Sequence, residues 1–277
     1  MNESNDTFKS FSTTNATNFG KEFLESNTLV AKFAFLLVAL IGFLLLLRVC
    51  LNLITWLSKP SASPHLIDGM VDASQLIVFP QDPSQSDAVT IYRSVDASQG
   101  LEFTWSVWIY INKLQSTQNT YKHIFSKGNS TLDDKGLVTP NNAPGLYITP
   151  YTNTLLVVMN TFNVINEEIL IPDIPMNKWV NIIVRCQNKE LDVYINGTIT
   201  RSLTLLCVPK QNYGEVYVGL NGGFDGNISN LWYYNYALGT SAIQRIATKG
   251  PNTKIVDGSM STAQSNYDYL SLRWFFR

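Results

Sequence analysis

Apolar and polar residues alternate along much of the chain after residue 75, and this period of two predicts short β-strands. The clearest case is Glu190–Ile195, where every second side chain is apolar, as in a half-buried antiparallel strand. Asn196 and Gly197 follow it and accept the positive φ angles of a tight hairpin turn. The segment therefore predicts a hairpin whose two faces meet different surroundings.

The same pattern predicts eleven strands separated by Gly, Pro, Asn and Asp residues, at 76–79, 89–93, 102–111, 123–127, 145–149, 154–161, 179–187, 190–195, 199–205, 215–220 and 227–236. The last of these alternates imperfectly, which predicts a bulge or a strand buried on both faces. Only residues 241–248 show a helical pattern, with Ser241 as the expected N-cap. The fold class expected is all-β, an antiparallel β-sandwich.

A different pattern precedes the strands, because residues 29–57 are strongly apolar and residues 33–47 carry no charged or amide side chain. Large apolar residues in that inner run contribute about −4 to −7 kcal/mol to membrane insertion. Lys32 and Arg48 lie sixteen positions apart, so both reach the interfaces of a bilayer core. The residues expected to contact lipid include Phe33, Leu36, Leu40, Leu44, Leu47 and the interfacial Trp56.

We expect one retained transmembrane helix, in place of a buried core helix or a cleavable signal peptide. A signal peptide ends in small residues, whereas Arg48, Val49 and Cys50 follow this run. Basic residues flank both ends of the helix, so charge leaves the orientation open. A non-cytosolic side for the C-terminal domain is the preferred localisation of this single-pass membrane protein.

The remaining segments are assigned by composition. Residues 1–28 are polar and predict a flexible tail, 58–74 a Pro/Ser-containing linker, and 75–251 the sandwich. Residues 252–277 end in an aromatic cluster that is costly to leave in water. We expect the cluster either to pack on the sandwich or to dock on a partner or membrane interface; its aromatic members are Tyr269, Trp274, Phe275 and Phe276.

Composition narrows the function classes. The 277 residues are 45% hydrophobic and carry a net charge of −1, so the chain as a whole has no electrostatic footprint for nucleic acid. Of the three cysteines, Cys50 lies in the apolar helix, which leaves Cys186 and Cys207 as a pair that could form one disulfide or none.

The predicted strand 102–111 carries aromatic residues on both faces. Phe103 and Trp105 fall on the face expected to build the core, and Trp108 and Tyr110 on the other. The second pair either lies beneath loops and a neighbouring strand, which we favour, or forms a stacking platform for a ligand.

Four phrases in a fixed order resemble the laminin-G-like branch of the concanavalin A-like lectin/glucanase superfamily over residues 89–251. They are FTWSVWIYI, HIFSKG, a strand led by Trp179 that runs into ELDVYING, and GFDGNISNLWYYNYAL. The resemblance implies a jelly roll of two curved antiparallel sheets. Its members bind sugars, proteins or calcium at the rim of the sandwich, or serve as structural modules.

We expect no cofactor; calcium is the one alternative that the resemblance leaves open. Oxygen ligands for such a hard cation are offered by Asp225, Asn227, Asp133 and Asp134. The alternative, which we favour, is that Asp225 and Gly226 form a turn and that the other two carboxylates are solvated.

Enzymes of the same superfamily carry a Glu-x-Asp-x-(x)-Glu strand motif, of which this chain has only Glu190 and Asp192. Tyr194 and Ile195 occupy the positions of the second glutamate, so a retaining glycosidase mechanism lacks one of its two carboxyl groups. The two histidines, His65 and His123, belong to no metal-ligand spacing. The sequence therefore predicts a protein that is not an enzyme.

Two upstream phrases, at residues 81–83 and 91–94, together with the single apolar span, are similar to membrane-anchored virion proteins of large double-stranded DNA viruses. The function expected is a structural or protein-interaction role in a membrane-associated assembly, with the lipid bilayer and proteins as partners. A carbohydrate-binding ectodomain, with glycans as partners, is the alternative.

Overall fold

The structure, a computed structural model, describes residues 21, 29–57, 61–85, 88–94, 100–114 and 119–256. The chain forms two compact units, Met1–Lys59 and Pro60–Arg277. The predicted tail 1–28 lies outside the described residues except for Lys21, and the aromatic cluster at 269–276 lies outside them entirely.

In the first unit, α2 (Leu29–Leu57) has the bounds that the sequence predicted. Its large apolar side chains are exposed along both its inner run and its ends. An uncharged apolar run with high helix propensity explains the helix, because no polar side chain in residues 33–47 competes for its backbone hydrogen bonds. It is the only helix within the described part of the chain that is long and apolar enough to cross a membrane.

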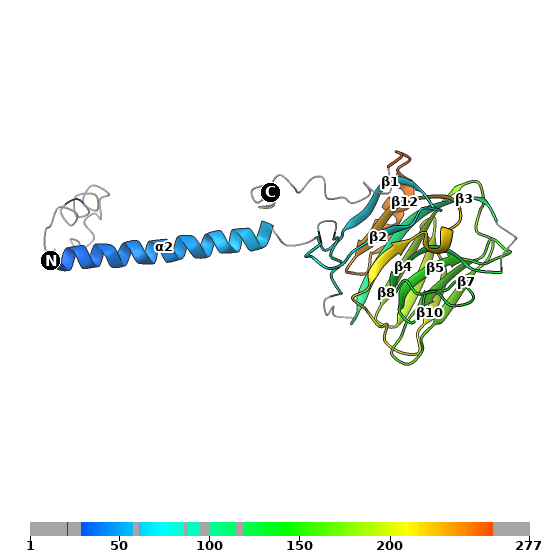
Figure 1. Cartoon of the computed structure of the whole chain (residues 1–277), viewed down its shortest axis with the longest axis horizontal. Coiled ribbons are helices and arrows are strands. Elements are labelled where there is room, and N and C mark those ends of the chain that lie inside the picture. Colours follow the sequence, from blue (N-terminus) through cyan, green and yellow to red (C-terminus); the bar gives the residue numbers. More distant parts are fainter. Residues whose placement is uncertain are drawn as a thin grey trace, which may run out of the picture. The chain divides into compact units, whose positions relative to one another are not determined.

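The second unit is an antiparallel β-sandwich, which confirms the predicted fold class (Figure 1). Its strands are β1 (His65–Asp72), β2 (Ile77–Phe79), β3 (Glu102–Lys113), β4 (Lys122–Gly128), β5 (Asn142–Ile148), β6 (Leu155–Met159), β7 (Glu167–Ile171), β8 (Trp179–Gln187), β9 (Glu190–Ile195), β10 (Thr198–Thr204), β11 (Glu215–Val218) and β12 (Asp225–Tyr234). They form two six-stranded sheets, sheet A in the order β1-β12-β3-β8-β9-β10 and sheet B in the order β2-β11-β4-β5-β6-β7.

The β9–β10 hairpin turns as predicted, because Asn196 and Gly197 both have positive φ angles. The irregularity predicted in β12 is also present: its pairing with β3 shifts register between Ser229 and Trp232. Asn230, within that shift, has a positive φ of 50°. These local signals were readable because each depends on residues close together in the sequence.

The core lies between the two sheets. Trp105 is 2% exposed and packs its ring against Phe125 of sheet B and Tyr233 of sheet A, with ring centroids 5.2 and 4.9 Å away. Alternating positions of β3, β8, β9 and β12 supply most of the sheet A side of this core. Burial of aromatic and β-branched side chains from both sheets is the main source of the fold's stability.

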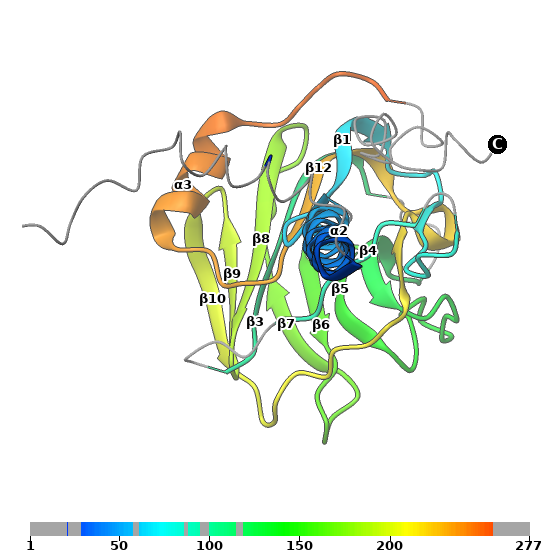
Figure 2. The ribbon, with the colours of Figure 1, turned by 90° about the vertical axis from the view of Figure 1, so that its left-hand side faces the viewer.

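Helix α3 (Thr240–Lys249) covers part of the outer face of sheet A, beside β9 and β10 (Figure 2). Ile243 of the helix packs with Ile183 and Tyr194, which point outward from sheet A. The outer face of β9 is therefore buried there, and not half solvated as its alternation suggested. Ser241 is not the N-cap, since the helix begins at Thr240 after Gly239 and no side chain caps it.

The predicted linker 58–74 is wrong over its second half. Residues His65–Asp72 form β1, with Leu66, Ile67 and Val71 buried, so the sandwich begins well before residue 75. At its other end the sandwich extends past residue 251, because Met70 exchanges backbone hydrogen bonds with Lys254 and Val256. Pairing between residues so far apart in sequence leaves little local signal.

The strand predicted at 89–93 is absent, and this described segment has no regular structure. The side chain of Gln81 takes the place of a partner strand, because its Nε2 donates to Val89 O and its Oε1 accepts from Ile91 N. Conversely, strand β7 (Glu167–Ile171) is present but was not predicted, although buried and exposed side chains alternate along it.

Candidate functional site

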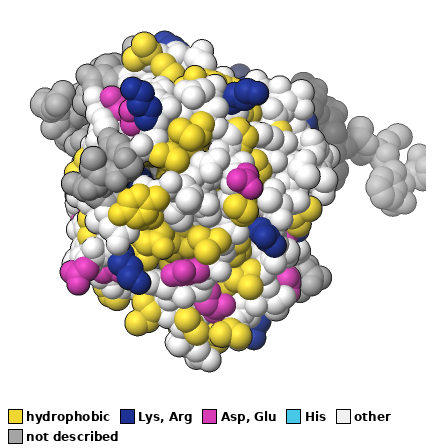
Figure 3. All heavy atoms as spheres, turned by 90° about the vertical axis from the view of Figure 1, so that its right-hand side faces the viewer, with side chains coloured by type: hydrophobic (Ala, Val, Ile, Leu, Met, Phe, Trp, Pro, Cys, Tyr) yellow, Lys and Arg dark blue, Asp and Glu magenta, His cyan; other side chains and the backbone are white. Residues whose placement is uncertain are grey.

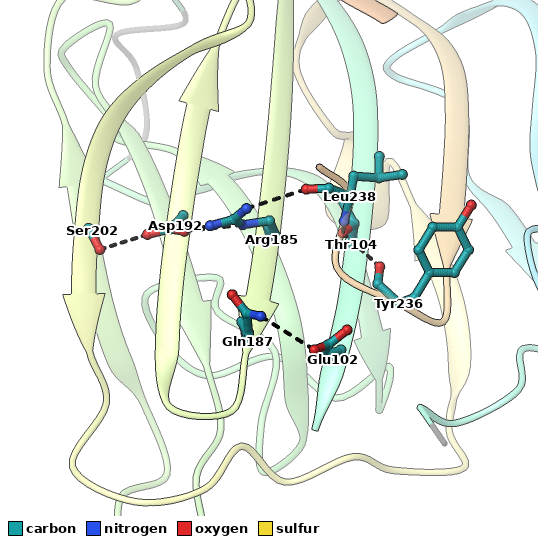
Figure 4. Close-up of polar contacts among 8 residues, drawn as sticks. All are labelled: Glu102, Thr104, Arg185, Gln187, Asp192, Ser202, Tyr236 and Leu238. Atoms are coloured by element: carbon teal, nitrogen blue, oxygen red, sulfur yellow. Dashed lines mark hydrogen bonds and ion pairs between the residues drawn. The ribbon is translucent and has the colours of Figure 1, made fainter. Parts of the chain in front are cut away.

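A chain of polar contacts crosses the outer face of sheet A and joins β10, β9 and β8 to the segment after β12 (Figure 4). Asp192 accepts two hydrogen bonds from Arg185, at 3.2 and 2.6 Å, and one from the Ser202 hydroxyl at 2.6 Å. Arg185 also donates to Leu238 O, while Leu238 N donates to the Thr104 hydroxyl. Each member of this network already has its partners, so the network stabilises the outer face.

A second row crosses the same face one level away, from Glu102 on β3 to Gln187 on β8 and Glu190 on β9. Gln187 donates to Glu102 at 3.4 Å, and Glu190 accepts from Thr204 at 2.8 Å. Next to this row, Tyr236 is 45% exposed and its backbone O accepts from Thr104. Carboxylates, an amide and a partly open aromatic ring therefore share one surface.

The arrangement does not oppose two acids across a cleft. Glu190 and Asp192 lie two residues apart on the same face of β9, and Asp192 is ion-paired with Arg185. Strand β8, which carries Gln187, lies between Glu190 on β9 and Glu102 on β3. A nucleophile and an acid/base facing one sugar from either side are therefore not provided by these residues.

His123 is fully enclosed and serves the fold. Its Nδ1 accepts the N–H of Leu220 at 3.1 Å, which assigns the ring proton to Nε2, 2.9 Å from the Ser126 hydroxyl. Burial lowers the pKa of His123 to about 3. The imidazole is thus neutral and hydrogen-bonded at both nitrogens.

Trp108 and Tyr110 do not form an open platform. Trp108 is 6% exposed, and Tyr110 is half-buried with its ring edge-on to Trp179, 5.5 Å between centroids. The burial of Trp108 agrees with the favoured expectation that this face is covered.

The four residues considered for calcium are not brought together as a ligand set. Asp225 opens β12, where it accepts from the Asn112 amide at 2.9 Å, and so does not form a turn with Gly226. Asp133 accepts the backbone N–H groups of Lys135 and Leu137. Within the described ranges, no group of three or more His, Cys, Asp or Glu side chains could hold a metal ion. Asn227 lies within β12, paired with Tyr110 of β3, and Asp134 is exposed.

Both sandwich cysteines are free thiols. Cys186 is buried between the sheets, and burial raises the pKa of its thiol to about 12. A disulfide with Cys207 is not formed in this structure.

Two small cavities lie in the sandwich. One, at the ends of β3 and β4 near Asp225, measures about 10 Å³, and another, beneath residues 91–93, measures about 20 Å³. Ligand pockets for whole small molecules typically measure roughly 300 Å³ or more. Neither cavity therefore encloses a whole small molecule.

Exposed apolar side chains gather on two loops at one end of the sandwich. Phe162, Ile165 and Leu206, here called the loop-end patch, are 67%, 61% and 73% exposed. The two loops are held together, because Phe162 N donates to Val208 O and Leu206 N donates to the Glu167 carboxylate. Figure 3 shows apolar side chains among acidic and basic ones over one face of the sandwich.

The sequence interpretation missed both the Arg185–Asp192 pair and the loop-end patch. The Arg185–Asp192 pair follows from the register of the β8–β9 hairpin, in which the two residues lie opposite each other. That pairing was readable from the two predicted strands. The patch depends on contact between loops about 40 residues apart, for which the sequence carries no periodic signal.

Comparison with known proteins identifies one family. A family model described as the concanavalin A-like lectin/glucanases superfamily matches residues 83–244, which confirms the resemblance inferred from the four sequence phrases. No curated protein matches the chain.

Similar solved structures include the receptor binding domain of botulinum neurotoxin C/D mosaic serotype, which is 16% identical with a TM-score of 0.43 and covers 54% of this chain and 36% of that chain. The botulinum neurotoxin serotype G binding domain is 12% identical with a TM-score of 0.46, covering 68% of this chain and 50% of that chain. This chain therefore spans between about a third and a half of the length of those proteins.

Proposed function

The chain belongs to the concanavalin A-like lectin/glucanases superfamily, and from this we propose that it is a non-enzymatic membrane-anchored protein whose sandwich binds a protein partner. The proposal has three parts, the anchor, the lack of catalysis and the contact surface. Each rests on a different region of the molecule.

The anchor is α2. Its 29 residues extend about 43 Å as a helix, compared with a bilayer hydrocarbon core of roughly 30 Å. Its large apolar side chains are exposed, so water is an unfavourable surrounding and lipid a favourable one. Lys32 and Arg48 flank the inner run, where their side chains reach the two interfaces.

We infer the lack of catalysis from the contacts that three carboxylates make. Asp192 neutralises Arg185, while Glu190 and Glu102 accept hydrogen bonds from neighbouring strands. None of these acids lines either of the two small cavities. We infer that the outer face of sheet A supports recognition or stability and not bond cleavage.

The observation that carries the proposal is the loop-end patch. Three large apolar side chains, each more than half exposed, stand on loops that hydrogen bonds hold in place. Exposed charges of both signs lie nearby in sequence, such as Glu168 and Lys210, which suits a protein surface better than an anionic membrane. A patch of this kind is typical of a protein contact.

Site-specific photo-crosslinking in the native membrane tests this proposal. A photoreactive residue replaces Phe162 or Leu206 in the full chain, and Thr200, exposed on β10, serves as the matched control. We expect discrete protein adducts from positions 162 and 206 and none from 200. Adducts to lipid alone, or equal adducts from all three positions, contradict a protein contact at the patch.

Carbohydrate binding is the second candidate function, favoured by the exposed ring of Tyr236 beside the polar row of Glu102 and Gln187. Aromatic faces stack on sugars while carboxylates and amides accept and donate hydrogen bonds. A glycan array with the full chain tests it: sugar-specific binding that Tyr236→Ala removes favours this function over the first. Sugar release that Glu190→Gln abolishes contradicts the non-enzymatic part of both.

The setting we propose is a membrane-associated assembly, with a virion membrane as its specific form. Support for the virion comes only from the sequence phrases at residues 81–83 and 91–94. Immunogold labelling of isolated particles checks this part separately.

A further inference from the structure

A cavity of about 20 Å³ opens between the two sheets, beneath residues 91–93. The segment 88–94 and the loop before β11 close over it, between sheet A and sheet B. Its lining residues are Ile91, Tyr92, Arg93, Phe103, Trp105, Lys127, Ala143, Gln211, Asn212 and Tyr233. This lining contains two cations and no carboxylate.

Lys127 is the unusual member of this lining. It follows Phe125 by two residues on β4, on the side of the strand that faces the core, and it is only 7% exposed. Its ammonium donates one hydrogen bond, to Gly214 O at 2.6 Å. Among the described residues no carboxylate pairs with it, and its other N–H donors have no acceptor.

Arg93 and Gln211 add further donors to the same cavity. Arg93 is exposed; it donates to Gln211 Oε1 at 3.2 Å and to the Tyr213 hydroxyl at 2.9 Å, which leaves its other guanidinium N–H groups for water or a ligand. Gln211 Nε2 is buried and has no hydrogen-bond partner. Lys127, Arg93 and Gln211 therefore present hydrogen-bond donors to one small space, and the two positive charges among them face no carboxylate in its lining.

A buried cation without a counter-charge is costly, and a bound anion removes that cost. We propose that this cavity binds the carboxylate group of a small ligand, held by Lys127, Arg93 and Gln211. The planar fork of the Arg93 guanidinium matches a carboxylate. One water fills roughly 10–15 Å³ of such a space, so a cavity of this size admits carboxylate oxygens while the rest of the ligand stays outside.

The site titrates in an accessible range. Burial lowers the pKa of the Lys127 ammonium to about 8. The other titratable groups at the cavity or in contact with it are Arg93 and the tyrosines 92, 213 and 233. Because the carboxylate needs the protonated amine, its affinity falls as the pH rises through about 8.

This inference does not depend on the proposed function, since neither the loop-end patch nor α2 contributes to the cavity. A failed carboxylate test leaves the photo-crosslinking result unaffected, and the reverse also holds.

Saturation-transfer NMR on the full chain in zwitterionic nanodiscs tests the site, with glucuronate as the probe and glucose as its uncharged control. We expect saturation of glucuronate and not of glucose, and displacement of glucuronate by acetate. Lys127→Met should abolish the signal, and Arg93→Gln should weaken binding about tenfold through loss of the fork. Lys210→Met, a nearby exposed lysine, should leave it unchanged.

Lys127→Met is also expected to raise the Tm of the ligand-free protein, because a buried cation is replaced by an apolar side chain of similar length. Equal saturation of glucuronate and glucose by the wild type overturns the proposal. Undiminished glucuronate binding by folded Lys127→Met or by Arg93→Gln overturns it as well.

Discussion

Helix α2 and the β-sandwich are both rich in large apolar side chains, but these are exposed in α2 and buried in the sandwich. The large apolar residues of α2 face outward along the helix, whereas those of β3, β8 and β9 are buried between two sheets. The sandwich supplies its own apolar surroundings, whereas the large apolar side chains of α2 remain exposed. One unit is therefore stabilised by folding on itself, while the other has the composition and exposure of the membrane anchor proposed above.

The largest expected effect separates the two units by damaging only the sandwich. Trp105→Ala removes a ring packed against both sheets and should lower the free energy of unfolding by about 3–5 kcal/mol. Chemical denaturation followed by tryptophan fluorescence measures it, with Tyr236→Ala, at a partly exposed ring, as the control. Membrane association should persist in the variant, and its loss would contradict the independence of the two units.

A charge in α2 should produce the reverse result. Leu40→Arg costs about 2.5–3.5 kcal/mol of insertion free energy at the centre of a helix, with Leu40→Phe as the matched control. An in vitro translocation assay should show less membrane integration of the Arg variant alone. The thermal unfolding of its sandwich should match the wild type, because α2 contributes nothing to the core.

Acid should weaken the sandwich through His123. Its folded pKa of about 3 lies below the unfolded value of 6.5, so below pH 6.5 the unfolded chain binds a proton that the folded chain rejects. The stability lost is roughly 2 kcal/mol by pH 5. Urea denaturation at pH 7 and pH 5 checks this, and an unchanged difference in His123→Gln would assign the loss to other groups.

The smallest effect concerns the polar cover of sheet A. Ser202→Ala removes the hydroxyl that donates to Asp192 at 2.6 Å and should cost about 1 kcal/mol. Thr200→Ala on the same strand is the control and should cost less. Equal losses in urea denaturation would show that the network in Figure 4 adds no stability of its own.

The two units also differ in what their sequences disclose. The bounds of α2 were predicted as Leu29–Leu57 because the apolar composition of a helix is a local property. The hairpin at Asn196 and Gly197 was predicted for the same reason. In contrast, β1 was mistaken for a linker, since its partner β12 lies about 160 residues away.

The strand predicted at residues 89–93 is wrong because a side chain, and not a neighbouring strand, binds the backbone of this segment. Gln81 satisfies the backbone there through its amide, an arrangement that strand periodicity does not reveal. The cavity near Lys127 was equally unreadable, because Arg93, Lys127 and Gln211 converge from three separate segments. Patterns of neighbouring residues therefore predicted the helix and most strands, whereas the cavity depends on tertiary contacts that the sequence does not reveal.

Alkaline carbonate extraction of membranes that contain the full chain tests the central claim most directly. The account predicts an intact 31.1 kDa chain in the membrane pellet, because α2 is retained and spans the bilayer. A shortened chain released into the supernatant would show that α2 is a cleaved signal, and release of the intact chain would show that it does not span.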